Sequence, residues 1–217
     1  MPHFFAERDG DQVSISGADA RHLATSLRAR PGQVIAVVES VGRLLQVRLE
    51  AVTSTLVTGW VEEERPHRPE PERQITLAVA VLPASSLDLV LSRCTEAGAS
   101  AFRLVAALRS VGRGGRPERW ASVCREAAML AGRLRVPEVS APVRLAAAWR
   151  EAAEPYLLDM SGEPMHGLPD GATLFIGPEG GWAPEERQVA AGRTLSLGPR
   201  NLRADTAALV GLTLALS

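Results

Sequence analysis

Strand-like and helix-like segments alternate along the chain from residue 74 onward. Residues 75–82 form a continuous apolar run, which is typical of a strand buried on both faces. Residues 86–97 are patterned as a helix, with Ser85 or Ser86 as its predicted N-cap, and residues 101–108 are apolar again. Strand, helix and strand in this order predict a parallel sheet with helical crossovers, and therefore an α/β fold.

The rest of the chain repeats this alternation. Helices are expected at residues 117–131 and 143–153, from residue 184, and at 204–216, and strands at 156–160, 172–176 and 194–197.

The first sixty residues have a different period. Apolar and polar side chains alternate at residues 34–38 and 45–49, on either side of a predicted hairpin turn at 40–42. Residues 18–27 are patterned as a short helix. We therefore expect a small β-barrel-like module over residues 1–61.

A charged and proline-rich segment follows this module. Residues 62–72 read EEERPHRPEPE and hold no apolar side chain that could offset the entropy of ordering them. This composition predicts a linker over residues 62–72, which places the α/β domain at residues 73–217.

Composition excludes several classes of protein. The formal net charge is −1, and all 24 basic residues are arginine, so a uniformly basic coat protein, a lysine Schiff base and a Gly-Lys phosphate loop are excluded. Cys94 and Cys124 lie outside any CxxC or histidine cluster, so we expect reduced core thiols and no metal site. No leader pattern or membrane-length apolar run is found, and the expected localisation is cytoplasmic.

Two glycine-rich loops follow two of the predicted strands. Residues 176–181 read IGPEGG, and residues 197–202 read LGPRNL. Glycines let the backbone approach a ligand and expose its N–H groups, and the carboxyl ends of parallel strands are where such sheets bind small molecules. Taken singly, each loop is equally compatible with a tight strand-to-helix turn.

Taken together, the two loops resemble those of a known family. The similar segments are IGPEGGW at 176–182 and LGPRNLRADTAA at 197–208, supported by TEAGA at 95–99 and REAAMLAGRLRVPEV at 125–139. The chain resembles the RsmE family of 16S ribosomal RNA (uracil-N3) methyltransferases, which belongs to the SPOUT superfamily of α/β-knot methyltransferases. The N-terminal module is similar to the PUA-like RNA-binding barrel of this family.

The resemblance implies a trefoil knot in the last third of the chain, a homodimer, and S-adenosylmethionine as the cofactor. The implied substrate is N3 of a single uridine in the decoding region of 16S ribosomal RNA in the small ribosomal subunit. The implied cofactor-binding residues are Ile176, Gly177, Pro178, Glu179, Gly180, Gly181, Leu197, Gly198, Asn201, Leu202 and Thr206.

Attack by uracil N3 requires loss of its proton and alignment of the ring with the methyl group. Alignment of this kind lowers a barrier by about 7–11 kcal/mol. Arg203 is the leading candidate to hydrogen-bond an oxygen of the uracil anion. Glu179 and Asp205 are candidate proton acceptors, although either could instead cap a helix or pair with Arg203.

The segment at residues 93–135 holds nine arginines against three glutamates, which predicts a surface that contacts RNA phosphates. A solvated surface with internal ion pairs is the alternative. The predicted RNA-binding residues, with three from the N-terminal module, are Arg21, Arg28, Arg30, Arg109, Arg113, Arg116, Arg119 and Arg133.

Two other functions stay open on the sequence. One is a catalytically degenerate RNA-binding or ribosome-assembly protein, because Leu130 and Ala131 stand where the family usually has glutamine and a small polar residue. The other is a knotted RNA 2′-O-ribose methyltransferase, which shares the glycine loops but not the N-terminal barrel.

Overall fold

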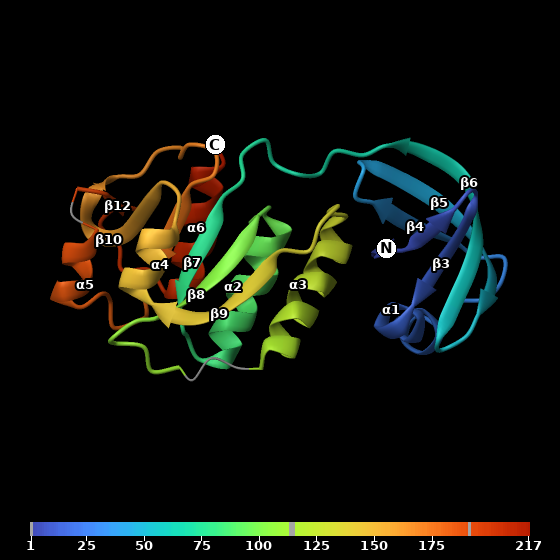
Figure 1. The fold of residues 1–217 in the computed structure, drawn as a ribbon, viewed down its shortest axis with the longest axis horizontal. Helices are drawn as coiled ribbons and strands as arrows, with labels where there is room; N and C mark the ends of the chain where they lie inside the picture. Colours follow the sequence, from blue (N-terminus) through green and yellow to red (C-terminus); the bar gives the residue numbers. More distant parts are fainter. Residues whose placement is uncertain (1, 113–115, 191) are drawn as a thin grey trace. The chain divides into compact units, whose positions relative to one another are not determined.

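The computed structural model describes residues 2–112, 116–190 and 192–217 (Figure 1). By its internal contacts the chain divides into two compact units. The first unit comprises Met1–Glu70 and Ala128–Arg135, and the second comprises Pro71–Ala127 and Val136–Ser217. Each unit contains its own cluster of buried apolar side chains.

The first unit is built on a curled six-stranded sheet with the strand order β1-β4-β5-β6-β3-β2 (Figure 1). A short helix, α1 (Gly17–Arg21), continues into a π-helical turn at His22–Ser26, which together cover the predicted helix. The expected hairpin is present, and Gly42 adopts a φ of 87° in its turn. The strands are β1 (His3–Phe5), β2 (Glu7–Asp9), β3 (Gln12–Ser16), β4 (Val34–Glu39), β5 (Arg43–Val52) and β6 (Leu56–Pro66).

The predicted linker is wrong for residues 62–66, which belong to β6. Backbone pairing of β6 with β5 continues as far as Pro66 opposite Arg43. A strand is held by its paired backbone groups and does not require apolar side chains. In β6 the acidic side chains form ion pairs with arginines on other strands of the sheet, which adds to the stability of the pairing. One example is the 2.5 Å ion pair between Arg48 Nε and Glu62 Oε1.

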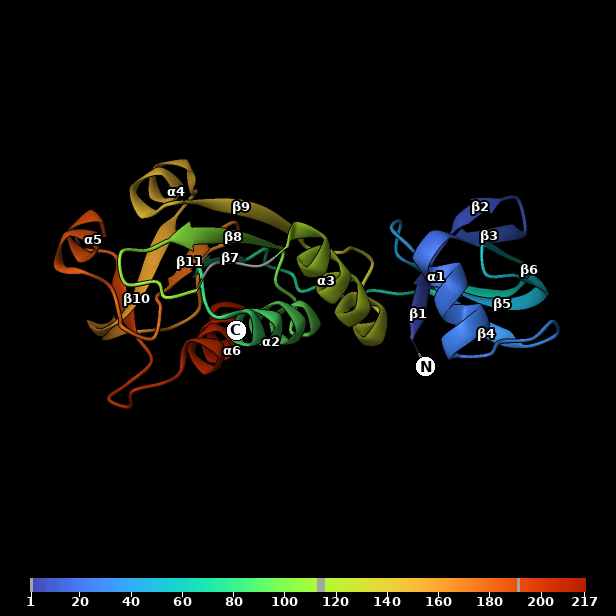
Figure 2. The same ribbon diagram turned by 90° about the horizontal axis from the view of Figure 1, so that it is seen from below.

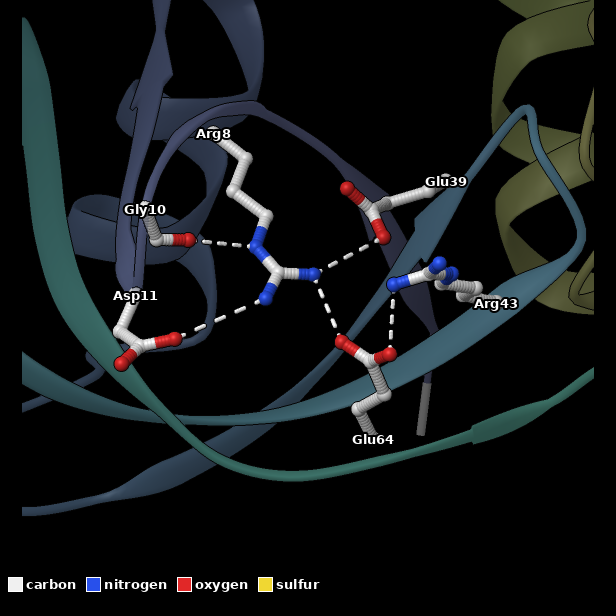
Figure 3. Close-up of polar contacts among 6 residues, drawn as sticks. All are labelled: Arg8, Gly10, Asp11, Glu39, Arg43 and Glu64. Carbon is white, nitrogen blue, oxygen red and sulfur yellow. Dashed lines mark hydrogen bonds and ion pairs between the residues drawn. The ribbon is translucent and has the colours of Figure 1, made fainter.

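A second ion-pair network joins four strands of this sheet (Figure 3). Arg8 Nη1 on β2 lies 3.2 Å from Glu39 Oε2 on β4 and 2.8 Å from Glu64 Oε2 on β6, and Arg43 Nη1 on β5 lies 2.5 Å from Glu64 Oε1. The hydrogen bond from Arg8 holds the pKa of the Glu64 carboxyl below its usual value. The network therefore contributes to holding the charged end of β6 within the sheet.

The second unit contains a six-stranded parallel sheet with the order β12-β10-β11-β7-β8-β9, as the alternating pattern predicts. Its strands are β7 (Thr76–Ala80), β8 (Ala101–Ala106), β9 (Glu138–Arg144), β10 (Pro155–Pro164), β11 (Thr173–Ile176) and β12 (Thr194–Ser196). Its helices are α2 (Ala84–Glu96), α3 (Pro117–Ala131), α4 (Leu145–Glu151), α5 (Pro184–Val189) and α6 (Ala204–Ala215).

Helices cover both faces of this sheet (Figure 2). Side chains of α2 and α6 join one buried cluster with Leu77 and Val79, whereas α4 packs in another with Ala78 and Phe175. Adjacent strand residues thus point into opposite cores, which explains the continuous apolar run at residues 75–82. Leu212 of α6 is fully buried in the first of these clusters, while Leu214 is exposed.

Three sequence predictions are settled in this unit. The expected helix at 143–153 begins only at Leu145, and β9 was missed because its largely exposed side chains leave no apolar period. α2 begins after Pro83 without the expected serine cap. Cys94 and Cys124 are both buried in the core, as predicted, and burial raises the pKa of Cys94 to about 12.

The end of β10 wraps closely around β12. Leu195 pairs with both Leu158 and Glu163 of β10, so residues 159–162 bulge around the shorter strand. A Cβ on Gly162 would lie 2.6 Å from the Leu195 backbone, so only glycine fits here. This wrapping brings the carboxyl ends of β10, β11 and β12 together.

No helix in the described residues is long and apolar enough to span a membrane.

Candidate active site

A pocket of about 470 Å³ lies where β11 and β12 end, beside the bulged part of β10. Its volume is in the range of small-molecule sites, and the carboxyl edge of a parallel sheet is where such sites form. Both glycine loops line it, as do residues 158–160 within β10. The lining residues are Leu158, Asp159, Met160, Ile176, Gly177, Pro178, Glu179, Gly180, Gly181, Trp182, Arg187, Leu197, Gly198, Arg200, Asn201, Leu202, Ala204 and Ala207.

The first loop is a tight turn fixed by a buried tryptophan. The Gly181 amide donates to Pro178 O at 2.8 Å, and Gly181 has a φ of 66°, which favours glycine. Trp182 Nε1 donates to Leu158 O at 3.0 Å, which ties this loop to β10 just before its bulge. A Cβ on Gly177 would lie 3.0 Å from the same Trp182 nitrogen, so glycine is required for the indole to fit.

The second loop leads from β12 into α6. Gly198 has a φ of 99°, and its amide donates to Ser196 Oγ at 3.2 Å. Ten of the eleven predicted cofactor-binding residues line the pocket, and Thr206 alone lies outside its lining. The Thr206 amide instead donates to Asp205 Oδ1 at 2.8 Å.

The predicted catalytic residues fall into two groups. Glu179 is exposed on the pocket wall, whereas Arg203 and Asp205 lie outside the lining, next to Leu202 and Ala204, which belong to it. Arg203 Nη2 is 3.2 Å from Asp205 Oδ2. The Arg203 side chain is 72% exposed, so its outer nitrogens are accessible from solvent.

Sequence reasoning missed the third wall of the pocket. Asp159 and Met160 lie within β10 and within the strand predicted at residues 156–160, and Arg187 comes from α5. Arg187 Nε donates to Asp159 Oδ2 at 2.9 Å. No local sequence pattern marks this wall, because its ion pair joins residues that lie far apart along the chain.

A buried carboxylate fastens the segment after β8 to the first loop. Glu186 Oε1 accepts the Leu108 amide and Oε2 accepts the Ala183 amide, both at 2.9 Å. Next in the chain, Arg109 Nη1 donates to Gly180 O at 3.0 Å. One predicted RNA contact is therefore held directly against the pocket.

The other predicted RNA-binding arginines differ in their surroundings. Arg21, Arg28, Arg30 and Arg116 are exposed, and Arg119 is exposed but pairs with Asp88 at 2.9 Å. Arg113 lies outside the described residues.

Arg133 does not fit the role of a surface contact. Its side chain is only 5% exposed, and Arg133 Nη2 lies 2.5 Å from Glu70 Oε2. The prediction that Arg133 binds RNA is therefore corrected, because its guanidinium is enclosed in an ion pair within the first unit. Among the described residues, no group of three or more His, Cys, Asp or Glu side chains is placed to hold a metal ion.

Comparison with known proteins identifies the family. A family model described as an RNA methyltransferase domain matches residues 68–216. The ribosomal RNA small subunit methyltransferase E of Mycobacterium bovis is 32% identical, with 94% of this chain and 85% of the relative aligned. The chain belongs to the ribosomal RNA small subunit methyltransferase E family. Its Synechocystis member is 30% identical over 92% of this chain and 71% of its own length.

Solved structures of relatives share the whole fold. The methyltransferase E of Neisseria gonorrhoeae, bound to S-adenosyl methionine, matches with a TM-score of 0.86 and 26% identity over 98% of this chain and 95% of its own. A Legionella pneumophila protein solved with SAM has a TM-score of 0.89 at 24% identity, over 99% and 95% of the two chains, which supports the fold alone. The predicted fold class, an α/β SPOUT knot domain with a PUA-like N-terminal module, is confirmed.

Proposed function

We propose that this family member transfers a methyl group from S-adenosylmethionine to N3 of one uridine in the decoding region of 16S ribosomal RNA. The observation that carries the proposal is the pocket at the ends of β11 and β12 and beside the bulge of β10. Its lining includes both glycine loops, the segments on which the resemblance to the family rests. When bound, S-adenosylmethionine supplies a methyl group on a positively charged sulfur.

The residues of the pocket fit such a cofactor. Ile176, Leu197 and Leu202 offer apolar surface for an adenine ring, and Gly177 and Gly198 leave the backbone open to close approach. Glu179 places negative charge on the pocket wall, which suits a ligand that carries a sulfonium.

Arg203 is proposed to steady the uracil anion. Its guanidinium stays protonated in proteins, so it donates hydrogen bonds to a uracil oxygen and does not act as the base. Asp205 already forms an ion pair with Arg203 and accepts a hydrogen bond from the Thr206 amide, which suits a positioning role. Glu179, exposed on the pocket wall, is then the proposed proton acceptor.

RNA binding is assigned to the exposed arginines. Arg109 and Arg116 belong to the second unit, and Arg21, Arg28 and Arg30 to the first. Guanidinium groups of this kind contact phosphates and position the RNA. The family resemblance also supports a homodimer, and a ribosomal substrate implies action in the cytoplasm.

The function is tested by incubating the protein with labelled S-adenosylmethionine and small ribosomal subunits that lack the modification. Nucleoside analysis is expected to yield 3-methyluridine at one position. Label on a ribose would instead identify a 2′-O-methyltransferase. Absence of both label and cofactor binding would identify a degenerate RNA-binding protein.

Arg203→Ala is expected to lower kcat about 10²–10³-fold, as loss of one anion-stabilising donor does elsewhere. Cofactor affinity, measured by calorimetry, should change less than about threefold, because Arg203 lies outside the pocket lining. Arg150→Ala, on the exposed side of α4, is the control. Turnover of Arg203→Ala near the wild-type rate would contradict the assignment.

A further inference from the structure

The ion pair between Arg187 and Asp159 is part of the pocket wall, yet the proposed chemistry leaves it without a role. Arg187 comes from α5 and Asp159 from the bulged part of β10. Arg187 Nε donates to Asp159 Oδ2 at 2.9 Å. The Asp159 side chain is 12% exposed and that of Arg187 is 46% exposed, so the carboxylate is enclosed while the guanidinium stays accessible.

Asp159 is held firmly by its own loop. Its Oδ1 accepts the Ser161 amide at 3.0 Å and the Ser161 hydroxyl at 2.7 Å. Burial raises the pKa of the Asp159 carboxyl, but these hydrogen bonds and the charge of Arg187 together lower it by more than burial raises it. The pKa of Asp159 therefore lies below its usual value. A fixed, ionised carboxylate therefore orients the guanidinium plane.

This arrangement leaves the outer edge of the guanidinium available. Nε of Arg187 donates to Asp159, and within the described part of the chain neither Nη nitrogen donates a hydrogen bond. Nη2 lies 3.9 Å from the position that a Cβ would take on Gly181, so the open edge is beside the first glycine loop. A planar edge with two N–H groups matches a carboxylate in a bidentate geometry.

We propose that Arg187, oriented by Asp159, binds the α-carboxylate of the methionyl part of the methyl donor. The inference rests on the proposed function, because it requires S-adenosylmethionine to occupy this pocket. The α-carboxylate is the single anionic group of that donor. Arg187 is thus a specificity-determining residue that selects donors with a carboxylate, and Asp159 is its positioning residue.

Arg200 is the other guanidinium that lines the pocket, but it offers a poorer site. It is exposed, and within the described residues it makes no ion pair that would orient it. A guanidinium that is already oriented loses less entropy when it binds, which favours Arg187.

The test compares S-adenosylmethionine with decarboxylated S-adenosylmethionine, which keeps the ammonium group and the sulfonium. Calorimetry on the wild-type protein is expected to show at least about tenfold tighter binding of the carboxylated ligand, the effect of a hydrogen bond to a charged group. In Arg187→Gln this ratio should fall to about threefold or less, while binding of the decarboxylated ligand stays unchanged. Asp159→Asn should lower the ratio although the arginine is present.

Arg193→Gln is the matched control. Arg193 is 44% exposed and pairs with Glu154 at 2.9 Å, but it lies outside the pocket lining, so its ratio should equal that of the wild type. A wild-type ratio in a folded Arg187→Gln protein would overturn the inference and leave the proposed function standing. The inference would also be overturned if Arg187→Gln lost affinity for RNA while the ratio of the two ligand affinities stayed unchanged. In that case Arg187 would bind an RNA phosphate. Failure of the wild type to bind either ligand would overturn both.

Discussion

His3 on β1 is an ionisable side chain placed where a charge is costly. Its ring stacks on His67 with centroids 5.9 Å apart and an interplanar angle of 12°. Its Nδ1 is buried, with no hydrogen-bond partner among the residues that the structure describes. Burial lowers the pKa of His3 below its ordinary value of 6.5; a backbone hydrogen bond with Met129 opposes this in part, and the nearby charges of His67 and Arg65 add to the lowering.

This site predicts acid sensitivity of the first unit. Because the folded-state pKa is depressed, the neutral ring contributes stability that is complete above pH 6.5 and is lost as the pH falls through the lower folded-state pKa. Urea unfolding at pH 7.5 and pH 5 should show a larger loss of stability for the wild type than for His3→Phe. Equal losses in the two proteins would contradict this account.

At the scale of the element, α5 matters through one carboxylate near its beginning. Glu186 accepts the amides of Leu108 and Ala183, and these bonds link the segment after β8 to the first glycine loop. The pattern Pro184-Glu185-Glu186 predicts a helix start, since carboxylates favour that end of the helix dipole. The hydrogen bond to the Leu108 amide is a tertiary contact, which the pattern of a helix start does not predict.

Glu186→Gln is expected to destabilise the protein by about 1–3 kcal/mol. Its NH₂ group replaces one of the two carboxylate oxygens and cannot accept a hydrogen bond from the backbone amide that this oxygen binds. Hydrogen exchange should report faster exchange at the Leu108 amide. Glu185→Gln, on the exposed side of the same turn, serves as the control. Unchanged exchange at Leu108 in Glu186→Gln would show that this carboxylate does not hold the segment.

Element patterns also show where sequence analysis succeeds and fails. The buried strands of the parallel sheet and α3 were found because apolar side chains recur at a period that burial imposes. β9 and the end of β6 were missed for the same reason, since both are held by backbone pairing while their side chains face solvent. The two loops of the pocket were predicted from their glycines, whereas Asp159 and Arg187 were not, because an ion pair between distant segments leaves no local pattern.

At the scale of the whole molecule, the first unit includes a segment from the middle of the chain. Residues Ala128–Arg135 belong with Met1–Glu70, and Met129 is part of that buried core. The ion pair of Arg133 with Glu70 joins these two stretches, and the Leu134 amide donates to the same carboxylate. No rule based on contiguous composition could assign residues 128–135 to the N-terminal unit.

Removal of this arginine tests the division. Arg133→Met leaves the Glu70 carboxylate, which is 25% exposed, without its charged partner, and should cost about 3 kcal/mol in urea unfolding. Arg133→Lys should lose less, because it keeps the charge without the planar fork. Arg21→Met, an exposed position in the same unit, should leave stability within about 0.5 kcal/mol. A loss for Arg133→Met no larger than that of Arg21→Met would contradict the structural role.

The order in which the pocket walls occur along the chain has a consequence for biosynthesis. The walls at residues 158–160 and 176–182 precede β12, but the remaining wall, from Leu197 to Ala207, is made last. A nascent polypeptide therefore has no complete pocket until Ala207 of α6 has been translated. A premature stop codon before Leu197 would leave a protein that retains the whole arginine-bearing N-terminal unit yet is inert in methyl transfer.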